Sequence, residues 1–307
     1  MSLLVQTGLF VLGLTLLVYG ASKAVTSAGD IALYYGVSTL FVGVTVISVG
    51  TSIPEMTTSI YAALYGAGDL AVGNIVGSET AQITLAIGIV ALIAPIPAER
   101  RNVMIYGGAM VLAMIIMILT VDDGVVQLSE GFLMMLSYVF FIYTLYTNEG
   151  GEEITEELEE QRPPERAIPW VIFGLALVIV GGNLMVTNGT AIARAAGVSE
   201  YLIGLLTGLG TTAPEIVVAS IAAYRGDQGI SVGAILGSNI TDPVFSLGIG
   251  ALFADIVVTD PATVRLSAFF MLGVSLVVLG LFYWREGIDR RTAVLCLLLY
   301  LPTFLIL

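Results

Sequence analysis

Gly50-Thr51-Ser52-Ile53-Pro54-Glu55 lies inside a long apolar segment of the chain. A proline in a helix interior removes one backbone hydrogen bond and crowds the carbonyl one turn earlier, so we expect the helix to break here. Thr51 and Glu55 are four residues apart and would share one face of a helix. A carboxylate in hydrocarbon is tolerated only where it lines a cavity or binds something. The stretch therefore predicts a buried site for a hard cation, which carboxylate and hydroxyl oxygens bind.

The same pattern returns as Gly210-Thr211-Thr212-Ala213-Pro214-Glu215. Aligning residues 50–96 with residues 210–256, an offset of 160, gives 18 identities in 47 positions without a gap. Each copy belongs to a half of five apolar segments, and an odd number of spans forces the second half to enter the membrane upside down. We therefore predict two inverted repeats whose proline-glutamate corners face one another near the midplane of the membrane.

The composition is that of a polytopic membrane protein. Hydrophobic residues make up 57% of the 307 residues and charged residues 11%, with a mean hydropathy of +0.97. An ordinary soluble domain has about 25% charged residues. One cysteine excludes an internal disulfide, and the absence of histidine excludes histidine zinc sites and imidazole proton relays. Any ion chemistry must therefore use carboxylates and neutral oxygens.

Apolar runs bounded by charged residues, Gly or Pro predict ten membrane spans, each near the ~20 residues that cross about 30 Å of hydrocarbon. They cover residues 3–22, 38–63, 70–95, 103–121, 127–146, 168–190, 201–223, 230–254, 264–283 and 292–306. No basic segment precedes the first span, so we interpret it as a retained helix and not a signal peptide. The predicted fold is an all-α membrane protein of ten transmembrane helices, in two inverted repeats of five with broken helices at the midplane.

The predicted domains are a first five-helix repeat (1–147), an acidic cytoplasmic linker (148–167) and a second five-helix repeat (168–307). Eight glutamates fall between Glu149 and Glu165. Such a run is typical of a solvated tether, and the alternatives are a short amphipathic helix or a weak cation sensor. Loops on one side of the membrane carry nine Lys and Arg residues against two on the other. We therefore expect a cell-membrane protein with a cytoplasmic linker and both termini outside.

A second motif follows each corner, at residues 73–82 and 233–242. On a helix Ser78 and Gln82 would share a face, as would Ser238 and Asp242. Combining the motifs gives the candidate ligands: the carboxylates of Glu55, Glu215 and Asp242, the side-chain oxygens of Thr51, Ser52, Thr211, Thr212, Ser78, Ser238 and Gln82, and backbone carbonyls freed near Ser48 and Gly208. Any single hydroxyl has the alternative of bonding only to its own helix backbone.

Glu79 is an acid without an acidic twin, because Asn239 stands at the matching place. Its alternatives are a ligand in the cavity, a position beside the ligands, or a contact between helices. No Lys or Arg lies in the four motif-bearing spans to balance the acids. Unpaired carboxylates at mid-bilayer are costly, so we expect cations or protons to balance them.

The motifs GTSIPE (50–55) and GTTAPE (210–215), with GNIVGS (73–78) and GAILGS (233–238), resemble the two alpha repeats of the cation/calcium exchanger superfamily. The resemblance is greatest to the prokaryotic sodium/calcium exchangers. In that family the repeat glutamates form a shared calcium and sodium centre, and hydroxyls and helix-break carbonyls shape flanking sodium sites. By motif match, the resemblance implies the first role for Glu55 and Glu215 and the second for the hydroxyl residues of both motifs. It also implies that the first span of each half is a gating helix.

The chain departs from the family pattern at Glu79, Gln82, Thr212 and Ala234. Members commonly have Asn in place of Gln82, and an amide there argues, by the family pattern, against potassium dependence. The departures bear on which ion is selected more than on the fold.

The resulting functional hypothesis is a secondary antiporter that exchanges Ca²⁺ for Na⁺ by alternating access, with no catalytic residues and no bound cofactor. Its partners would be membrane lipid and the transported Ca²⁺ and Na⁺ (or H⁺), with no nucleic acid, and a monomer would suffice. The alternative is a Ca²⁺/H⁺ exchanger that uses the same glutamates. A cation channel is more remote, as is an intramembrane aspartyl protease, suggested by the GxGD pattern of residues 66–69.

Overall fold

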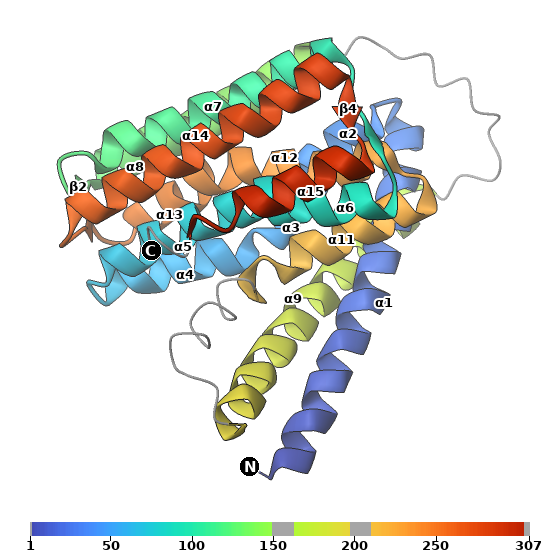
Figure 1. The fold of residues 1–307 in the computed structure, drawn as a ribbon, viewed down its shortest axis with the longest axis horizontal. Coiled ribbons are helices and arrows are strands. Elements are labelled where there is room, and N and C mark those ends of the chain that lie inside the picture. The colour runs from blue at the N-terminus through green and yellow to red at the C-terminus, as the bar shows by residue number, and fades with distance from the viewer. Residues whose placement is uncertain (1, 149–162, 197–209, 304–307) are drawn as a thin grey trace.

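A computed structural model describes residues 2–148, 163–196 and 210–303 (Figure 1). Gly208 and most of the predicted linker lie outside these residues. The first half contains α1 (Leu3–Tyr35), α2 (Thr39–Val42), η1 (Gly43–Ile47), α3 (Ser48–Thr51), α4 (Ile53–Leu64), α5 (Gly68–Ala81), η2 (Gln82–Ala86), α6 (Ile87–Ile93), β1 (Ile96–Pro97), α7 (Arg100–Val121), β2 (Val125–Val126) and α8 (Leu128–Asn148). The second contains α9 (Pro164–Ala195), α11 (Ala213–Arg225), α12 (Gln228–Thr241), η3 (Asp242–Ser246), α13 (Leu247–Ala251), β3 (Ile256–Val257), α14 (Pro261–Arg285), β4 (Gly287–Ile288) and α15 (Arg290–Leu299).

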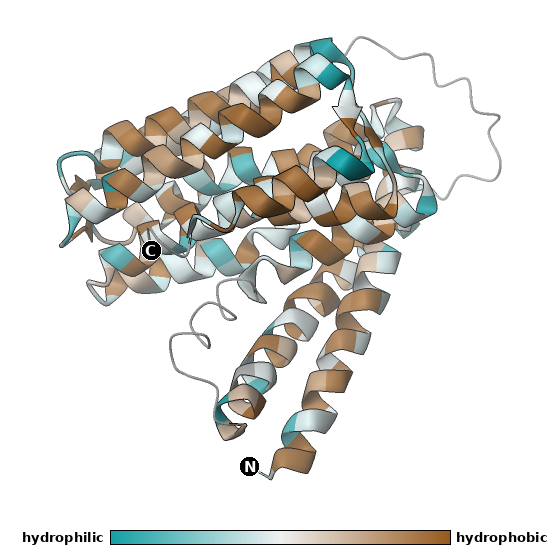
Figure 2. Ribbon diagram, in the orientation of Figure 1, coloured by the Kyte–Doolittle hydropathy of each residue, from teal (hydrophilic) through white to brown (hydrophobic). Residues whose placement is uncertain are grey.

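The long helices have the length and the surface of membrane spans. Within the described residues, seven helices are long and apolar enough to cross a membrane, and the bent pair Thr39–Thr51 and Ile53–Leu64 makes up to eight. The other two predicted spans, residues 201–223 and 292–306, are described only in part. Hydrophobic residues dominate the long helices in Figure 2. Large apolar side chains lie on the surface, such as that of Leu119, which is 70% exposed. The chain is therefore a multi-pass membrane protein, as its composition predicts.

The second span is broken where the sequence predicts. Its two parts meet at an angle of 44°, and Pro54 occupies the first turn of α4. The carbonyl of Ser48 nevertheless accepts the Ser52 N–H at 2.9 Å and the Thr51 hydroxyl at 3.2 Å. The carbonyl of Ser48 itself is therefore not freed, although the expectation covers carbonyls near Ser48. The hydrogen bond that Pro54 cannot make belongs to the carbonyl of Gly50, four residues earlier.

Wider π-helical turns interrupt three of the described spans. The segments η2 and η3 begin at Gln82 and Asp242, which are one repeat offset apart. Such turns occur mostly as single insertions in α-helices and are frequent at functional sites. Both therefore widen the helix at a candidate ligand.

Strand pairs and ion pairs join the two halves in equivalent ways. β1 pairs with β4, with Ile96 opposite Ile288, and β2 pairs with β3, with Val126 opposite Ile256. The positions of Ile96 and Ile256 differ by the repeat offset of 160. On α7 and α14, Arg100 pairs with Glu286 and Arg265 with Asp122, each at 3.0 Å. Exchanging the halves exchanges the two strand pairs, as an inverted repeat requires. The ion pairs are alike in kind, because each joins an Arg near the start of one helix to the acid that follows the other helix.

The first helices of the two halves, α1 and α9, pack together and extend away from the other helices (Figure 1). A Cβ atom on Gly20 would lie 2.5 Å from the carbonyl oxygen of Gly174, and one on Gly13 would lie 2.8 Å from that of Gly181. The order of these contacts shows that α1 and α9 run antiparallel. Small residues let two backbones approach closely in a membrane. Arg225 of α11 also donates hydrogen bonds to α1, at the Ser22 carbonyl (3.1 Å) and at the side chains of Ser22 and Thr26.

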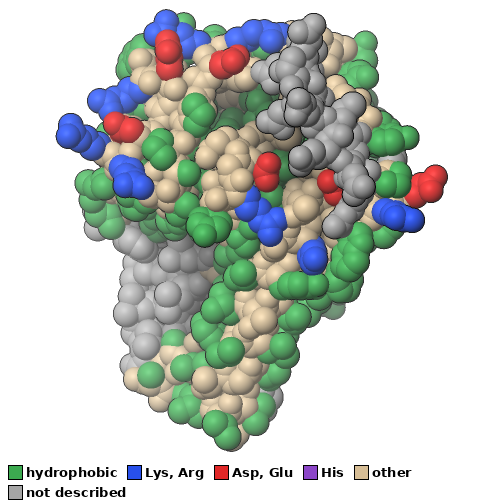
Figure 3. Space-filling view, turned by 90° about the vertical axis from the view of Figure 1, so that its right-hand side faces the viewer, with side chains coloured by type: hydrophobic (Ala, Val, Ile, Leu, Met, Phe, Trp, Pro, Cys, Tyr) green, Lys and Arg blue, Asp and Glu red, His purple; other side chains and the backbone are tan. Residues whose placement is uncertain are grey.

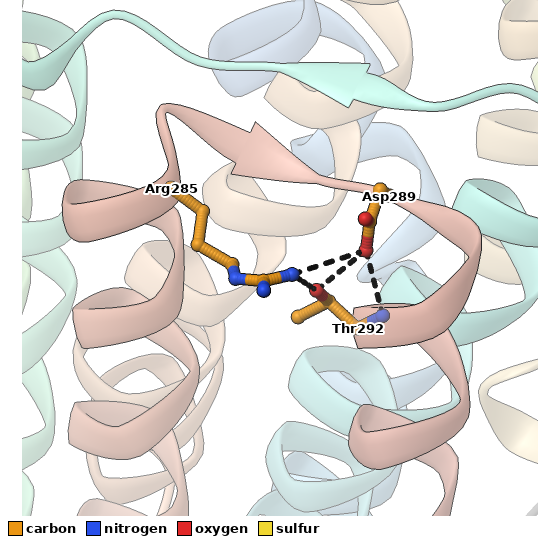
Figure 4. A network of polar contacts seen from close by, with 3 residues as sticks. All are labelled: Arg285, Asp289 and Thr292. Carbon is orange, nitrogen blue, oxygen red and sulfur yellow. Dashed lines mark hydrogen bonds and ion pairs between the residues drawn. The ribbon is translucent and has the colours of Figure 1, made fainter.

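A polar corner fixes the start of α15 (Figure 4). The Asp289 carboxylate accepts hydrogen bonds from the Thr292 N–H at 2.8 Å and the Thr292 hydroxyl at 2.6 Å, and it forms an ion pair with Arg285 at 3.5 Å. The hydrogen bonds from Thr292 hold the pKa of the Asp289 carboxyl below its usual value. This is an N-cap, which satisfies a backbone donor that the helix leaves free.

Candidate cation site

The motif-bearing segments of both halves meet inside the molecule. α4 contacts η3, α11 contacts η2, and α5 also contacts η3. The first two contacts are equivalent under the repeat offset. Each half therefore contributes one proline-glutamate corner and one π-helical turn to the same buried region, which we call the carboxylate cage: Glu55, Glu79, Gln82, Glu215 and Asp242.

Glu55 and Glu215 occupy the first turns of α4 and α11. Both are fully buried, and none of their four carboxylate oxygens makes a hydrogen bond with normal geometry in the described part of the chain. The two side chains are close enough to interact electrostatically. A helix N-terminus favours a negative charge by about 0.3–1 kcal/mol, up to ~2 when partly buried, which is less than the several kcal/mol that burying an ion costs. Positive charge must therefore balance this pair.

Asp242 and Gln82 meet across the two halves. Gln82 Nε2 lies 3.4 Å from Asp242 Oδ2, and the Ser246 hydroxyl donates to Asp242 Oδ1 at 2.8 Å. Asn239 Nδ2 donates to Gln82 Oε1 at 2.7 Å and to the Ile235 carbonyl at 2.9 Å. Asn239 thereby holds the Gln82 amide with its nitrogen toward Asp242. Gln82 consequently acts as a donor in this structure, whereas the sequence prediction uses its oxygen as a ligand.

The predicted hydroxyl ligands fall into two groups. Thr51 and Ser78 donate to backbone carbonyls of their own helices, at Ser48 (3.2 Å) and Ile75 (3.0 Å), which is the alternative considered for each hydroxyl. Their lone pairs still remain available. By contrast, the buried hydroxyl oxygens of Ser52 and Ser238 make no hydrogen bond with normal geometry to a described residue.

Within the cage, Thr51 lies next to Glu215, and Ser52 lies next to Asp242. Thr212 is fully buried, whereas Thr211 is half-buried. Gly208 lies outside the described residues.

Sequence reasoning missed three polar residues beside the cage. Asn239 was noted only as the counterpart of Glu79, although it positions Gln82. The spacing of Ser246, four residues after Asp242, would have placed it on the same helical face. The hydroxyl of Thr241 lies 3.4 Å from that of Ser48 in the other half, and no local pattern signals this contact.

The charges of the cage are not balanced by protein cations. The buried polar and charged side chains of the described residues include no Lys or Arg. The carboxylate of Glu55 interacts with those of Glu215, Asp242 and Glu79. In the described chain, however, no three acidic residues lie close enough to hold a single metal ion. A cation held by two of these carboxylates would complete its coordination with neutral oxygens.

Two inverted halves, broken helices and buried carboxylates together define a membrane transporter of cations. Comparison with known proteins agrees with this class. The family model described as sodium/calcium exchanger protein matches residues 5–147 and 166–307. The chain therefore belongs to the sodium/calcium exchanger family.

Individual relatives match the chain over nearly its full length. It is 31% identical to the putative antiporter CaxA of Alkalimonas amylolytica, covering 94% of this chain and 93% of that protein. It is 26% identical to the sodium/calcium exchanger MaX1 of Methanosarcina acetivorans, covering 97% of each. A solved structure of the sodium-calcium exchanger NCX_Mj soaked with 100 mM Na⁺ and 10 mM Sr²⁺ matches with a TM-score of 0.83 and 30% identity, covering 100% of this chain and 99% of that one.

Proposed function

We propose that the protein is a secondary antiporter that exchanges Ca²⁺ for Na⁺ by alternating access, with both ions binding at Glu55 and Glu215. The observation that carries the proposal is that these two carboxylates, one from each inverted half, are fully buried and make no normal hydrogen bond within the described residues. Buried ions without partners are retained in proteins where they bind something.

The oxygens around this pair suit Ca²⁺. It takes about six to eight oxygen ligands in a flexible arrangement, whereas Mg²⁺ demands a near-ideal octahedron and keeps several waters. Glu55 and Glu215 supply up to four carboxylate oxygens, and Thr51 next to Glu215 supplies a hydroxyl. Na⁺ would use the same oxygens, so the two ions compete for one site.

Competition at this site accounts for exchange without leak. An empty cage carries unbalanced negative charge through the low-dielectric interior, which is strongly unfavourable. Only an ion-loaded cage would therefore pass easily between outward-facing and inward-facing states. The part that moves is the pair α1 and α9, whose close glycine contacts hold the two helices together as one unit beside the cage-bearing helices.

Flux measurements on purified protein in sealed vesicles test the proposal. We expect an outward Na⁺ gradient at constant pH to drive ⁴⁵Ca²⁺ uptake, and an outward proton gradient without Na⁺ to drive none. Uptake with the pH gradient alone would instead support Ca²⁺/H⁺ exchange. Ionic currents on the order of millions of ions per second would support a channel. The same vesicles without protein give the background.

We also propose an orientation of the protein in the cell membrane. Lys and Arg side chains gather toward one end of the face in Figure 3, which supports that end as the cytoplasmic one. The linker would then be cytoplasmic and both termini outside the cell membrane. We further propose that the protein acts without catalytic residues or a bound cofactor and works as a monomer.

A further inference from the structure

Glu79 is a fourth buried carboxylate that the proposed exchange reaction does not require. It lies on α5, its side chain is fully buried, and neither of its carboxylate oxygens has a hydrogen-bond partner among the described residues. It interacts electrostatically first with Asp242 and then with Glu215. Because α5 contacts η3, which begins at Asp242, the two carboxylates come from segments packed against each other.

The repeat symmetry relates Glu79 and Asp242 to a second pair of residues, Asn239 and Gln82. Asn239 and Gln82 meet across the two halves through a hydrogen bond of 2.7 Å between two amides. Exchanging the halves by the offset of 160 converts Asn239 into Glu79 and Gln82 into Asp242. Glu79 and Asp242 thus repeat the placement of Asn239 and Gln82, with two acids in place of two amides. Two amides can donate and accept, but two carboxylates can only accept.

The hydrogen-bond donors around Glu79 and Asp242 do not compensate for two carboxylates that can only accept. Asp242 accepts one hydrogen bond at each oxygen, from Ser246 and Gln82, whereas Glu79 accepts none that meets normal geometry within the described chain. An ionised group that is buried without partners costs several kcal/mol. A positive charge between the two acids would remove that cost.

We infer that Glu79 and Asp242 together bind one monovalent cation of the Na⁺ class, in addition to the ion at Glu55 and Glu215. The inference rests on the proposed function. Glu79 adds one negative charge to those of Glu55, Glu215 and Asp242, and one bound monovalent cation offsets that addition. A second Ca²⁺ would need about six to eight oxygens, more than the four of this pair.

Counting bound Na⁺ tests the inference without any transport. Equilibrium binding of ²²Na⁺ to the purified full-length protein, at saturating Na⁺ and without Ca²⁺, is compared with that of Glu79→Asn. This substitution introduces at position 79 the same residue type that its repeat counterpart, Asn239, has. The new amide can donate a hydrogen bond to Asp242. We expect the variant to bind one Na⁺ fewer per chain. Glu99→Gln removes one exposed carboxylate and should leave the count unchanged.

An equal count in Glu79→Asn and the original chain would overturn the inference, because no bound Na⁺ would then depend on Glu79. A proton shared between the two acids in place of Na⁺ would produce this result. If the variant does not yield folded protein, Glu79→Gln, which keeps the side-chain length, replaces it with the same expectation. Loss of Na⁺-driven ⁴⁵Ca²⁺ uptake in Glu55→Gln tests the proposed function separately. Retained uptake in Glu55→Gln would contradict the proposed function, whereas an unchanged Na⁺ count in Glu79→Asn would contradict only the inference about Glu79. The two failures are therefore distinguishable.

Discussion

Glu55→Gln is the substitution that most directly tests the role of the carboxylate pair. The amide keeps the size and shape of the side chain but removes its charge. Glu55 is fully buried and neither of its oxygens hydrogen bonds to a described residue, so the substitution breaks no normal hydrogen bond of the protein. A purely structural carboxylate would show a loss of stability. A ligand would show a loss of calcium binding.

The expected magnitude follows from removing one partner of a buried charge pair, which costs about 2–5 kcal/mol. At about 1.4 kcal/mol per tenfold change, the dissociation constant for Ca²⁺ should rise roughly 30-fold to several thousand-fold. At a Ca²⁺ concentration 100 times the original dissociation constant, binding stabilises the folded protein by about 2.7 kcal/mol. With 30-fold weaker binding, the same relation gives about 0.9 kcal/mol or less.

The assay is the thermal unfolding of detergent-purified protein with and without Ca²⁺. We expect the melting temperature of Glu55→Gln without Ca²⁺ not to fall, because the variant has lost a buried charge. Its increase on adding Ca²⁺ should be a third or less of the original increase, while Glu99→Gln behaves like the original chain. A Glu55→Gln variant that keeps the full Ca²⁺-dependent increase would refute the reasoning.

Two further predictions concern the framework that holds the cage. Gly20→Ala should lower the free energy of unfolding by about 1–3 kcal/mol, because its Cβ would clash with the Gly174 carbonyl, whereas Gly29→Ala meets open space and should be neutral or stabilising. Equal thermal unfolding of the two variants would contradict the tight contact between α1 and α9. Asp289→Ala should lower the free energy of unfolding at neutral pH by removing the cap of α15. The pKa of Asp289 is lowered in the folded state, so this difference in stability should shrink as the pH falls through that pKa. A difference that does not change between pH 7 and acid pH would show that the carboxylate does not act through its charge.

The repeated stretch largely determined the architecture. Two copies of one pattern in halves with an odd number of spans predict opposite orientations, and the strand pairs between the halves follow that symmetry. The bend at Pro54 was equally predictable, because it depends on one residue and its own helix. These features are local or periodic, so they can be inferred without knowing which segments touch.

Only the tertiary structure decided which residues of the cage contact and hydrogen bond to one another. The orientation of the Gln82 amide depends on Asn239, 157 residues away, and the closeness of Glu79 to Asp242 depends on how α5 packs against η3. The carbonyl of Ser48 likewise has partners that a proline rule does not reveal. A sequence pattern fixes which face of a helix a side chain occupies. Which donor meets which acceptor is decided by contacts between distant segments, because a hydrogen bond depends on distances of a few tenths of an ångström.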